Sequence, residues 1–199
     1  MCGRFESKRI DDDLPDLFKY LNLELEIDPD IKDRPTEDIR PTQKILTVLL
    51  NDEVYRLTNV IWGIKFSDDS PLIFNSRIET IKEKKFWNSL LAKNRCVVPM
   101  TGFYEWKTEG NKKTKFRIYL PDQRIFFVPA IYQKDKDNKI HASLITTTPN
   151  KFIQTIHHRM PVILNLNEAI KYLNEDAENN IKRCLPYDNE KPMELELTP

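Results

Sequence analysis

Apolar residues along this chain recur mainly with the two-residue period of β-strands. Short apolar runs of about four to eight residues, bounded by Gly, Pro, Asn or Asp, are typical of strands. The turns at 51–52 and 109–111 predict two β-hairpins, spanning 45–57 and 102–120. The expected strands are 45–50, 54–57, 59–66, 72–74, 96–100, 102–107, 115–120, 125–131, 142–148 and 160–164.

Fewer segments show the helical period. Leu14, Leu17 and Phe18 follow three aspartates, Asp11 to Asp13, and this pattern predicts a capped helix with these acids at its positive end. Residues 22–44 contain three prolines and are expected to form a loop, and the polar C-terminal tail is expected to hold no element. The other expected helices are 80–93, 150–157, 167–173 and 177–184.

Many short strands with interspersed helices predict an α+β fold in which most strands are antiparallel. We expect one domain over residues 1–199, with a curved, barrel-like sheet and flanking helices. The length of 199 residues and the hydrophobic share of 40% are sufficient for one core.

Composition excludes several classes of protein. Basic and acidic residues number 31 each, so net charge does not favour nucleic acid, although basic residues predominate between residues 75 and 117. Three scattered cysteines, Cys2, Cys96 and Cys184, predict a reducing compartment and no disulfide framework. The sequence has neither a secretory signal nor an apolar run that would span a membrane. We therefore expect a cytoplasmic monomer without a metal or cofactor.

The pair Met1-Cys2 is chemically unusual. If Met1 is removed, Cys2 carries an α-amine with a pKa near 8 beside a thiol with a pKa near 8.5. Such an amine attacks an aldehyde to form an imine, and the adjacent thiol closes the imine into a thiazolidine. The alternative is that Cys2 occupies this position by chance.

Two further residues are candidates for proton transfer. Glu105 lies between Tyr104 and Trp106, where desolvation would raise its pKa into a range useful for acid–base catalysis. Alternatively, Glu105 faces solvent and pairs with a basic neighbour. His157 precedes His158 between a helix and a strand, and the alternatives for this pair are a surface position or a metal ligand.

Polar and basic residues elsewhere suit a DNA strand. Arg77 follows a strand end, where its guanidinium would bind a phosphate, or the segment caps the next helix. The hairpin 102–120 combines lysines with Trp106 and other aromatics, a composition typical of single-strand binding or of a solvated hairpin face.

Four separated blocks share the pattern of one known family. They are Met1–Phe5, Asn75–Thr80, Arg95–Cys96 together with Gly102–Trp106, and Ile156–Pro161. In order and spacing the chain resembles the SOS response-associated peptidase (SRAP) family of abasic-site processing proteins. Two stretches depart from its pattern: Glu37–Pro41, and Ile64–Asp68, where Phe66 is the one aromatic residue.

The resemblance implies a sensor of abasic sites in single-stranded DNA that acts in the SOS and DNA damage response. Cys2 would form a thiazolidine cross-link after removal of Met1, Asn75 would position it, and Glu105 and His157 would transfer protons. The protein would be cytoplasmic and associated with the nucleoid when bound. Autoproteolytic and abasic-site lyase activities are expected as well. The residues expected to contact DNA are Arg4, Arg40, Arg77, Trp106, Lys107 and Arg159.

A rival function belongs to another class of enzyme. Cys2 as nucleophile and His157 as base would make a cysteine peptidase, acting on other proteins or only on its own Met1-Cys2 bond. Non-covalent single-strand binding is a third possibility, and it leaves Cys2 without a role.

Overall fold

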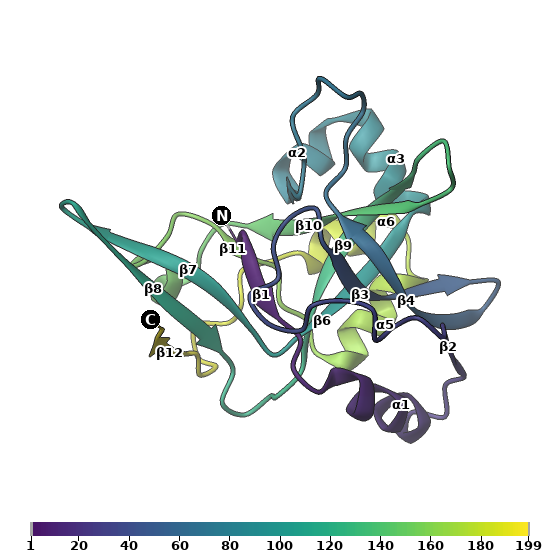
Figure 1. Ribbon diagram of the computed structural model, residues 1–199, viewed down its shortest axis with the longest axis horizontal. Coiled ribbons are helices and arrows are strands. Elements are labelled where there is room, and N and C mark those ends of the chain that lie inside the picture. Colours follow the sequence, from purple (N-terminus) through teal and green to yellow (C-terminus); the bar gives the residue numbers. More distant parts are fainter. Residues whose placement is uncertain (1, 199) are drawn as a thin grey trace.

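A closed ring of strands forms the centre of the computed structural model, which describes residues 2–198. Antiparallel pairing joins β10 (Ile140–Thr147), β9 (Phe126–Lys134), β6 (Arg95–Met100), β3 (Lys44–Asn51) and β4 (Val54–Trp62) in that order. A short parallel pairing of β4 with β10, at His141↔Ile61 and Ala142↔Trp62, closes the ring (Figure 1). The predicted α+β class and the barrel-like curvature are confirmed.

Three short strands extend this ring. β2 (Leu25–Ile27) pairs with β4, whereas β5 (Asn75–Arg77) and β11 (Met160–Pro161) both pair with β10. Because β5 and β11 share one partner strand, the Asn75 block and the segment after His157 lie at the same end of the barrel.

A second, four-stranded sheet leaves the barrel as a long hairpin (Figure 1). Its order is β1 (Arg4–Glu6), β7 (Gly102–Glu109), β8 (Lys112–Tyr119) and β12 (Glu194–Leu197), and its pairs are antiparallel. Gly110 makes the tight turn with φ of +56°, a conformation that glycine adopts without strain. The predicted hairpin 102–120 is confirmed.

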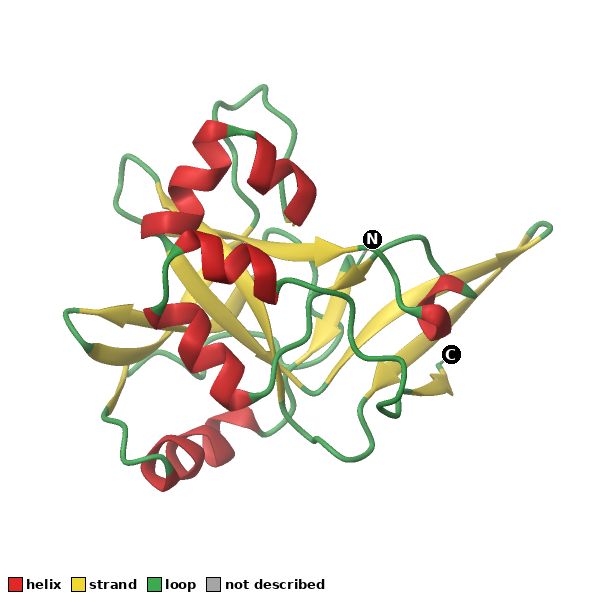
Figure 2. Cartoon of the chain, turned by 180° about the vertical axis from the view of Figure 1, so that it is seen from behind, coloured by secondary structure: helices red, strands yellow, loops and turns green. Residues whose placement is uncertain are grey.

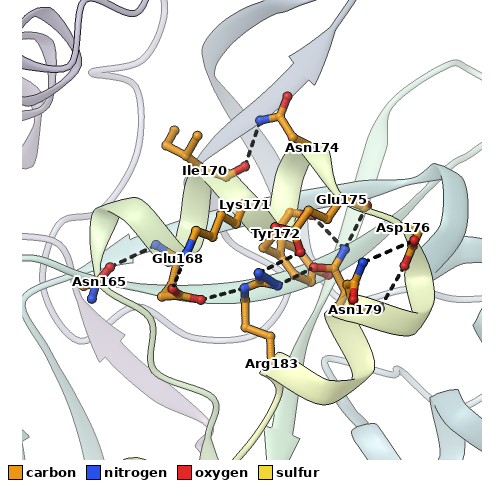
Figure 3. Close-up of polar contacts among 11 residues, drawn as sticks. Asn165, Glu168, Ile170, Lys171, Tyr172, Asn174, Glu175, Asp176, Asn179 and Arg183 are labelled. Atoms are coloured by element: carbon orange, nitrogen blue, oxygen red, sulfur yellow. Dashed lines mark hydrogen bonds and ion pairs between the residues drawn. The ribbon is translucent and has the colours of Figure 1, made fainter.

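Most helices cover one face of the large sheet, as the view from behind shows (Figure 2). At the end of α6 (Ala177–Arg183), Arg183 donates to Glu168 and Glu175 at 2.7 and 2.8 Å and so fixes α5 (Leu166–Asn174) against α6 (Figure 3). The helices are α1 (Ile10–Tyr20), α2 (Ile78–Glu83), α3 (Lys85–Lys93), α4 (Lys151–Gln154), α5 (Leu166–Asn174) and α6 (Ala177–Arg183). None in the described chain is long and apolar enough to cross a membrane.

Two apolar clusters follow from this arrangement. One lies between the barrel and the helices and includes Phe18, Leu91 and Tyr172. The other contains Cys2 and Trp62, together with residues of β6, β9 and β10. The second cluster therefore places the start of the chain against the barrel.

Several predicted bounds of strands were wrong. Residues 54–62 form one strand rather than two, because β3 pairs with all of β4. In the expected strand 72–74, Ile73 makes only an isolated bridge and pairing begins at Asn75. The expected strand 160–164 shortens to two residues, with Leu164 in a separate bridge. β2 and β12 lie in segments expected to hold no strand.

The helix predictions also need correction. The expected helix 80–93 breaks at Lys84, whose backbone is extended, and the expected helix 150–157 shortens to α4. The aspartates at 11–13 lie in the first turn of α1 but do not cap it. The N-cap residue is Arg9, which makes no side-chain capping bond.

Candidate functional site

Cys2 is fully buried at the edge of the second apolar cluster. Its thiol lies 3.7 Å from the carbonyl oxygen of Arg4. Burial raises the pKa of this thiol well above its usual value, and the nearby charge of Glu105 raises it further. The resting thiol is therefore protonated at neutral pH. The predicted loss of Met1 concerns a residue outside those described.

The amide of Asn75 holds Cys2 in place. Its Nδ2 donates to the carbonyl oxygen of Cys2 at 2.8 Å, and parallel pairing with Leu144 fixes the backbone of Asn75. The Oδ1 of Asn75 is buried and has no hydrogen-bond partner among the described residues. A buried acceptor of this kind is costly unless it serves a ligand or a reacting group.

Glu105 lies at the same end of the β1–β7 pair as Cys2. The register Arg4↔Tyr104 places Glu105 one step beyond the last paired residue of β1, toward the start of the chain. Its side chain is 2% exposed, and burial raises the pKa of its carboxyl to about 7. The alternative of a solvent-facing residue paired with a basic neighbour is therefore excluded.

His157 follows α4 and stacks on His158, with 4.3 Å between the ring centroids. The backbone N–H of Arg159 lies 3.0 Å from its Nδ1, and the Arg159 carbonyl oxygen lies 3.2 Å from the same nitrogen. In the tautomer in which Nδ1 accepts from the N–H, the neutral ring carries its proton on Nε2. Burial lowers the pKa of His157, and the charge of His158 lowers it further. Ile153 and Met160, on either side of His157, belong to the same cluster as Cys2.

Arg159 connects the last sequence block to the second. It makes two bonds of 2.9 Å with the carboxylate of Glu79 and donates to the carbonyl of Thr146 at 2.8 Å. The hydrogen bond from Arg159 is the largest cause that lowers the pKa of Glu79. Arg159 was predicted to contact DNA, and its buried guanidinium binds these protein oxygens.

Three residues predicted to contact DNA gather beside Cys2. Arg4 and Arg40 both bind the carboxylate of Asp38, at 2.9 and 2.7 Å. The guanidinium of Arg4 also lies 5.4 Å from the centre of the Trp106 ring. Lys107 instead pairs with Glu109 toward the tip of the hairpin, at 2.6 Å, and Arg77 is exposed on β5.

Sequence reasoning missed a buried polar network beneath β1. The carboxylate of Glu6 accepts hydrogen bonds from Arg117 Nε and Tyr104 Oη at 2.8 Å each, and from Thr101 Oγ1 at 3.2 Å. A Cβ at Gly102 would come within 3.2 Å of this carboxylate, so the glycine leaves room for it. No sequence pattern indicates this network, because its members are far apart in the chain.

The Glu6 network predicts a pH-dependent contribution to stability. Burial raises the pKa of Glu6, but the bonds from Arg117 and Tyr104 outweigh it, and the net pKa is lowered. Glu6 therefore stabilises the fold above the ordinary carboxyl pKa, and this contribution is lost as pH falls through its lowered pKa. We expect Glu6→Gln to cost about 1.5–3 kcal/mol at pH 7 in urea unfolding, the range for hydrogen bonds to a charged group, and clearly less near pH 3.

Glu196→Gln is the matched control for this experiment. Glu196 contacts the same Arg117 at 3.2 Å, but its side chain is 61% exposed. Its removal is expected to change the free energy of unfolding by less than about 1 kcal/mol. Equal losses in both variants would contradict a special role for the buried carboxylate.

The whole chain matches one family model. The family described as "SOS response associated peptidase (SRAP)" matches residues 1–199. The chain is similar to the abasic site processing protein YoaM of Bacillus subtilis, with 33% identity over 94% of this chain and 87% of that protein. It is also similar to the abasic site processing protein YedK of Escherichia coli, with 30% identity over 88% of this chain and 81% of that protein.

Solved structures agree with these matches. A crystal structure of a protein from Bacteroides thetaiotaomicron superimposes with a TM-score of 0.79 and 25% sequence identity. The matched region covers 99% of this chain and 91% of the Bacteroides chain. This protein therefore shares the overall fold of that solved structure.

Proposed function

The chain belongs to the SOS response associated peptidase (SRAP) family, and from this premise we propose that it links covalently to abasic sites in single-stranded DNA. The bond would form through Cys2 after removal of Met1. The observation that supports this most directly is the placement of Cys2, which is bound by Asn75 and lies near a carboxyl with a pKa of about 7. These are the groups that imine chemistry requires.

The proposed reaction has two stages. The neutral amine of Cys2 attacks the aldehyde of the ring-opened sugar, and the carbinolamine loses water to give an imine. The thiol then gives up its proton to a base and adds to the protonated C=N bond, and a thiazolidine forms that keeps one hydrogen on its nitrogen. The overall balance is protein plus DNA minus one water.

Glu105 and His157 have separate proposed tasks. A carboxyl with a pKa of about 7 is present in both protonation states at neutral pH, so Glu105 protonates the leaving hydroxyl and then accepts the thiol proton. His157, in the neutral tautomer whose Nδ1 accepts from the Arg159 N–H, donates its Nε2 proton to the sugar oxygen as the ring opens. The unpartnered Oδ1 of Asn75 accepts a hydrogen bond from an N–H of the Cys2 amine and so orients the nitrogen lone pair.

The raised pKa of the Cys2 thiol favours this reaction over a cysteine peptidase. A peptidase nucleophile attacks as a thiolate, and burial opposes that form here. In the thiazolidine route the amine reacts first. The thiol reacts only after the iminium has formed, and the positive charge of the iminium favours deprotonation of the thiol.

Intact-protein mass spectrometry tests the proposed function. Incubation with a single-stranded oligonucleotide bearing one abasic site is expected to give a species of summed mass less one water, which survives heating. The same oligonucleotide with its aldehyde reduced to an alcohol is the control and should give no adduct. Cys2-dependent cleavage of unrelated peptides, without any DNA adduct, would instead establish the peptidase.

A further inference from the structure

Asp38 lies at the centre of three cations beside the candidate site. Arg4 Nη1 contacts both of its carboxylate oxygens, at 2.9 and 3.0 Å. Arg40 Nη2 approaches to 2.7 Å and Lys115 Nζ to 3.5 Å. These groups come from three separate segments, and Asp38 is the carboxylate on which they converge.

The backbone places this cluster next to Cys2. The N–H and C=O groups of Ile39 pair with those of Phe5, at 2.9 and 3.3 Å, so the segment 38–40 runs along β1. On the other side of β1, β7 carries Trp106, whose ring lies under the Arg4 guanidinium. A strand whose sugar reaches Cys2 would pass this cluster with its neighbouring phosphates.

The charges of the cluster do not balance. Three cations face one carboxylate, and the four side chains are between 21% and 56% exposed. Burial raises the pKa of Asp38, but the bonds from Arg40 and Arg4 outweigh it and lower the net pKa, so the carboxylate is charged at neutral pH. A residual positive charge around an anion is what a phosphodiester recognises, since two arginines can offer paired donors to its oxygens.

We propose that Arg4, Arg40 and Lys115 form a phosphodiester subsite for the DNA strand, and that Asp38 occupies it in the free protein. The incoming phosphate displaces the carboxylate and takes over its donors. Asp38 thereby weakens binding to strands in general and restricts stable binding to strands that also engage Cys2. This inference rests on the proposed function, because it requires a DNA strand at the site.

Asp38→Asn is the decisive variant because asparagine has the same shape and also tolerates the left-handed conformation of residue 38, whose φ is 45°. The probe is a single-stranded oligonucleotide with a tetrahydrofuran abasic analogue, which lacks an aldehyde and reports equilibrium binding alone. We expect binding to tighten about three- to tenfold, because competing ion pairs of modest strength are removed. The salt dependence should steepen by about 0.7 in log K per log salt for one added phosphate contact.

Three comparisons make the result specific. Glu178→Gln changes the net charge equally at an exposed pair with Lys182 on α6, and it should leave affinity unchanged. Adding Arg40→Ala to Asp38→Asn should remove the gain. In a series of probes, one phosphate at a time is replaced by a neutral methylphosphonate. The replacement should abolish the gain in affinity of Asp38→Asn at one position near the abasic analogue. If the cluster bound only free inorganic phosphate, no position in the series would have this effect.

The outcomes separate the subsite from the proposed function. If wild-type protein forms the covalent adduct but Asp38→Asn binds equally or more weakly, the subsite is wrong and the function stands. If Asp38→Asn binds more tightly while the wild-type protein forms no adduct, the subsite stands and the covalent chemistry is wrong. If Glu178→Gln raises the affinity for the probe equally, the change in net charge alone explains the result, and the proposed subsite is wrong.

Discussion

Cys2→Ala is expected to abolish the heat-stable DNA adduct while leaving the fold intact. The alanine amine still attacks the sugar aldehyde, so an imine forms, but no thiol is present to close the ring. The imine hydrolyses on denaturation unless borohydride reduces it first. We expect the heat-stable adduct to disappear, because no thiazolidine can form, and strand cleavage by elimination to appear in its place.

Two other variants check this expectation. Cys184→Ala removes a buried thiol far from β1 in the sequence and should retain full adduct formation. Cys2→Ser should give a less durable adduct, because oxygen closes the ring less favourably than sulfur. A heat-stable adduct formed equally by Cys2→Ala, or one mapped to a lysine, would show that the bond does not involve the Cys2 thiol.

Local patterns in the sequence predicted the parts of the fold that depend on neighbouring residues. The alternating residues and the Glu109-Gly110-Asn111 turn indicated the hairpin of β7 and β8, and Gly110 has the positive φ that the turn requires. Hydrophobic periodicity similarly indicated α1 and α5. In these elements the local sequence preference is strong and agrees with the tertiary packing, so the prediction from local pattern holds.

The closure of the barrel and the β1 strand were not predictable. The β4–β10 pairing involves two residues on each strand, and no local pattern specifies it. β1 is only three residues, Arg-Phe-Glu, and its charged ends suggest an exposed segment. Glu6 is nevertheless fully buried, because Arg117 and Tyr104 supply donors from distant strands.

The candidate site was predictable as a list of residues but not as an arrangement. Sequence blocks indicated Cys2, Asn75, Glu105 and His157. Their burial and hydrogen bonds depend instead on the pairing of β1 with β7 and on how β5 and β11 share β10. Asp38 shows what the sequence does not reveal about the arrangement of side chains. An acidic residue in a loop gives no sequence signal that three cations will converge on it.

Glu105→Gln is expected to slow adduct formation about 10²–10³-fold, the range of a lost general acid–base group. Glutamine retains the shape of the side chain but transfers no proton. The wild-type rate should show an inflection near pH 7, where the Glu105 carboxyl titrates, and the variant should lose it. Glu178→Gln, at an exposed residue of α6, is the matched control and should keep both the rate and the profile.

The same variant should be more stable than the wild-type protein at alkaline pH. The pKa of Glu105 is raised in the fold, so its ionised form is disfavoured there, and stability is lost as pH rises from the unfolded carboxyl pKa to about 7. Glu105→Gln escapes this loss and should gain on the order of 2–3 kcal/mol at pH 8, with little of this advantage at pH 4. Urea unfolding at the two pH values measures it. If Glu105→Gln forms the adduct more slowly and is also less stable at pH 8, Glu105 is a structural residue. If the variant is slower but more stable, Glu105 is retained for proton transfer at the expense of stability.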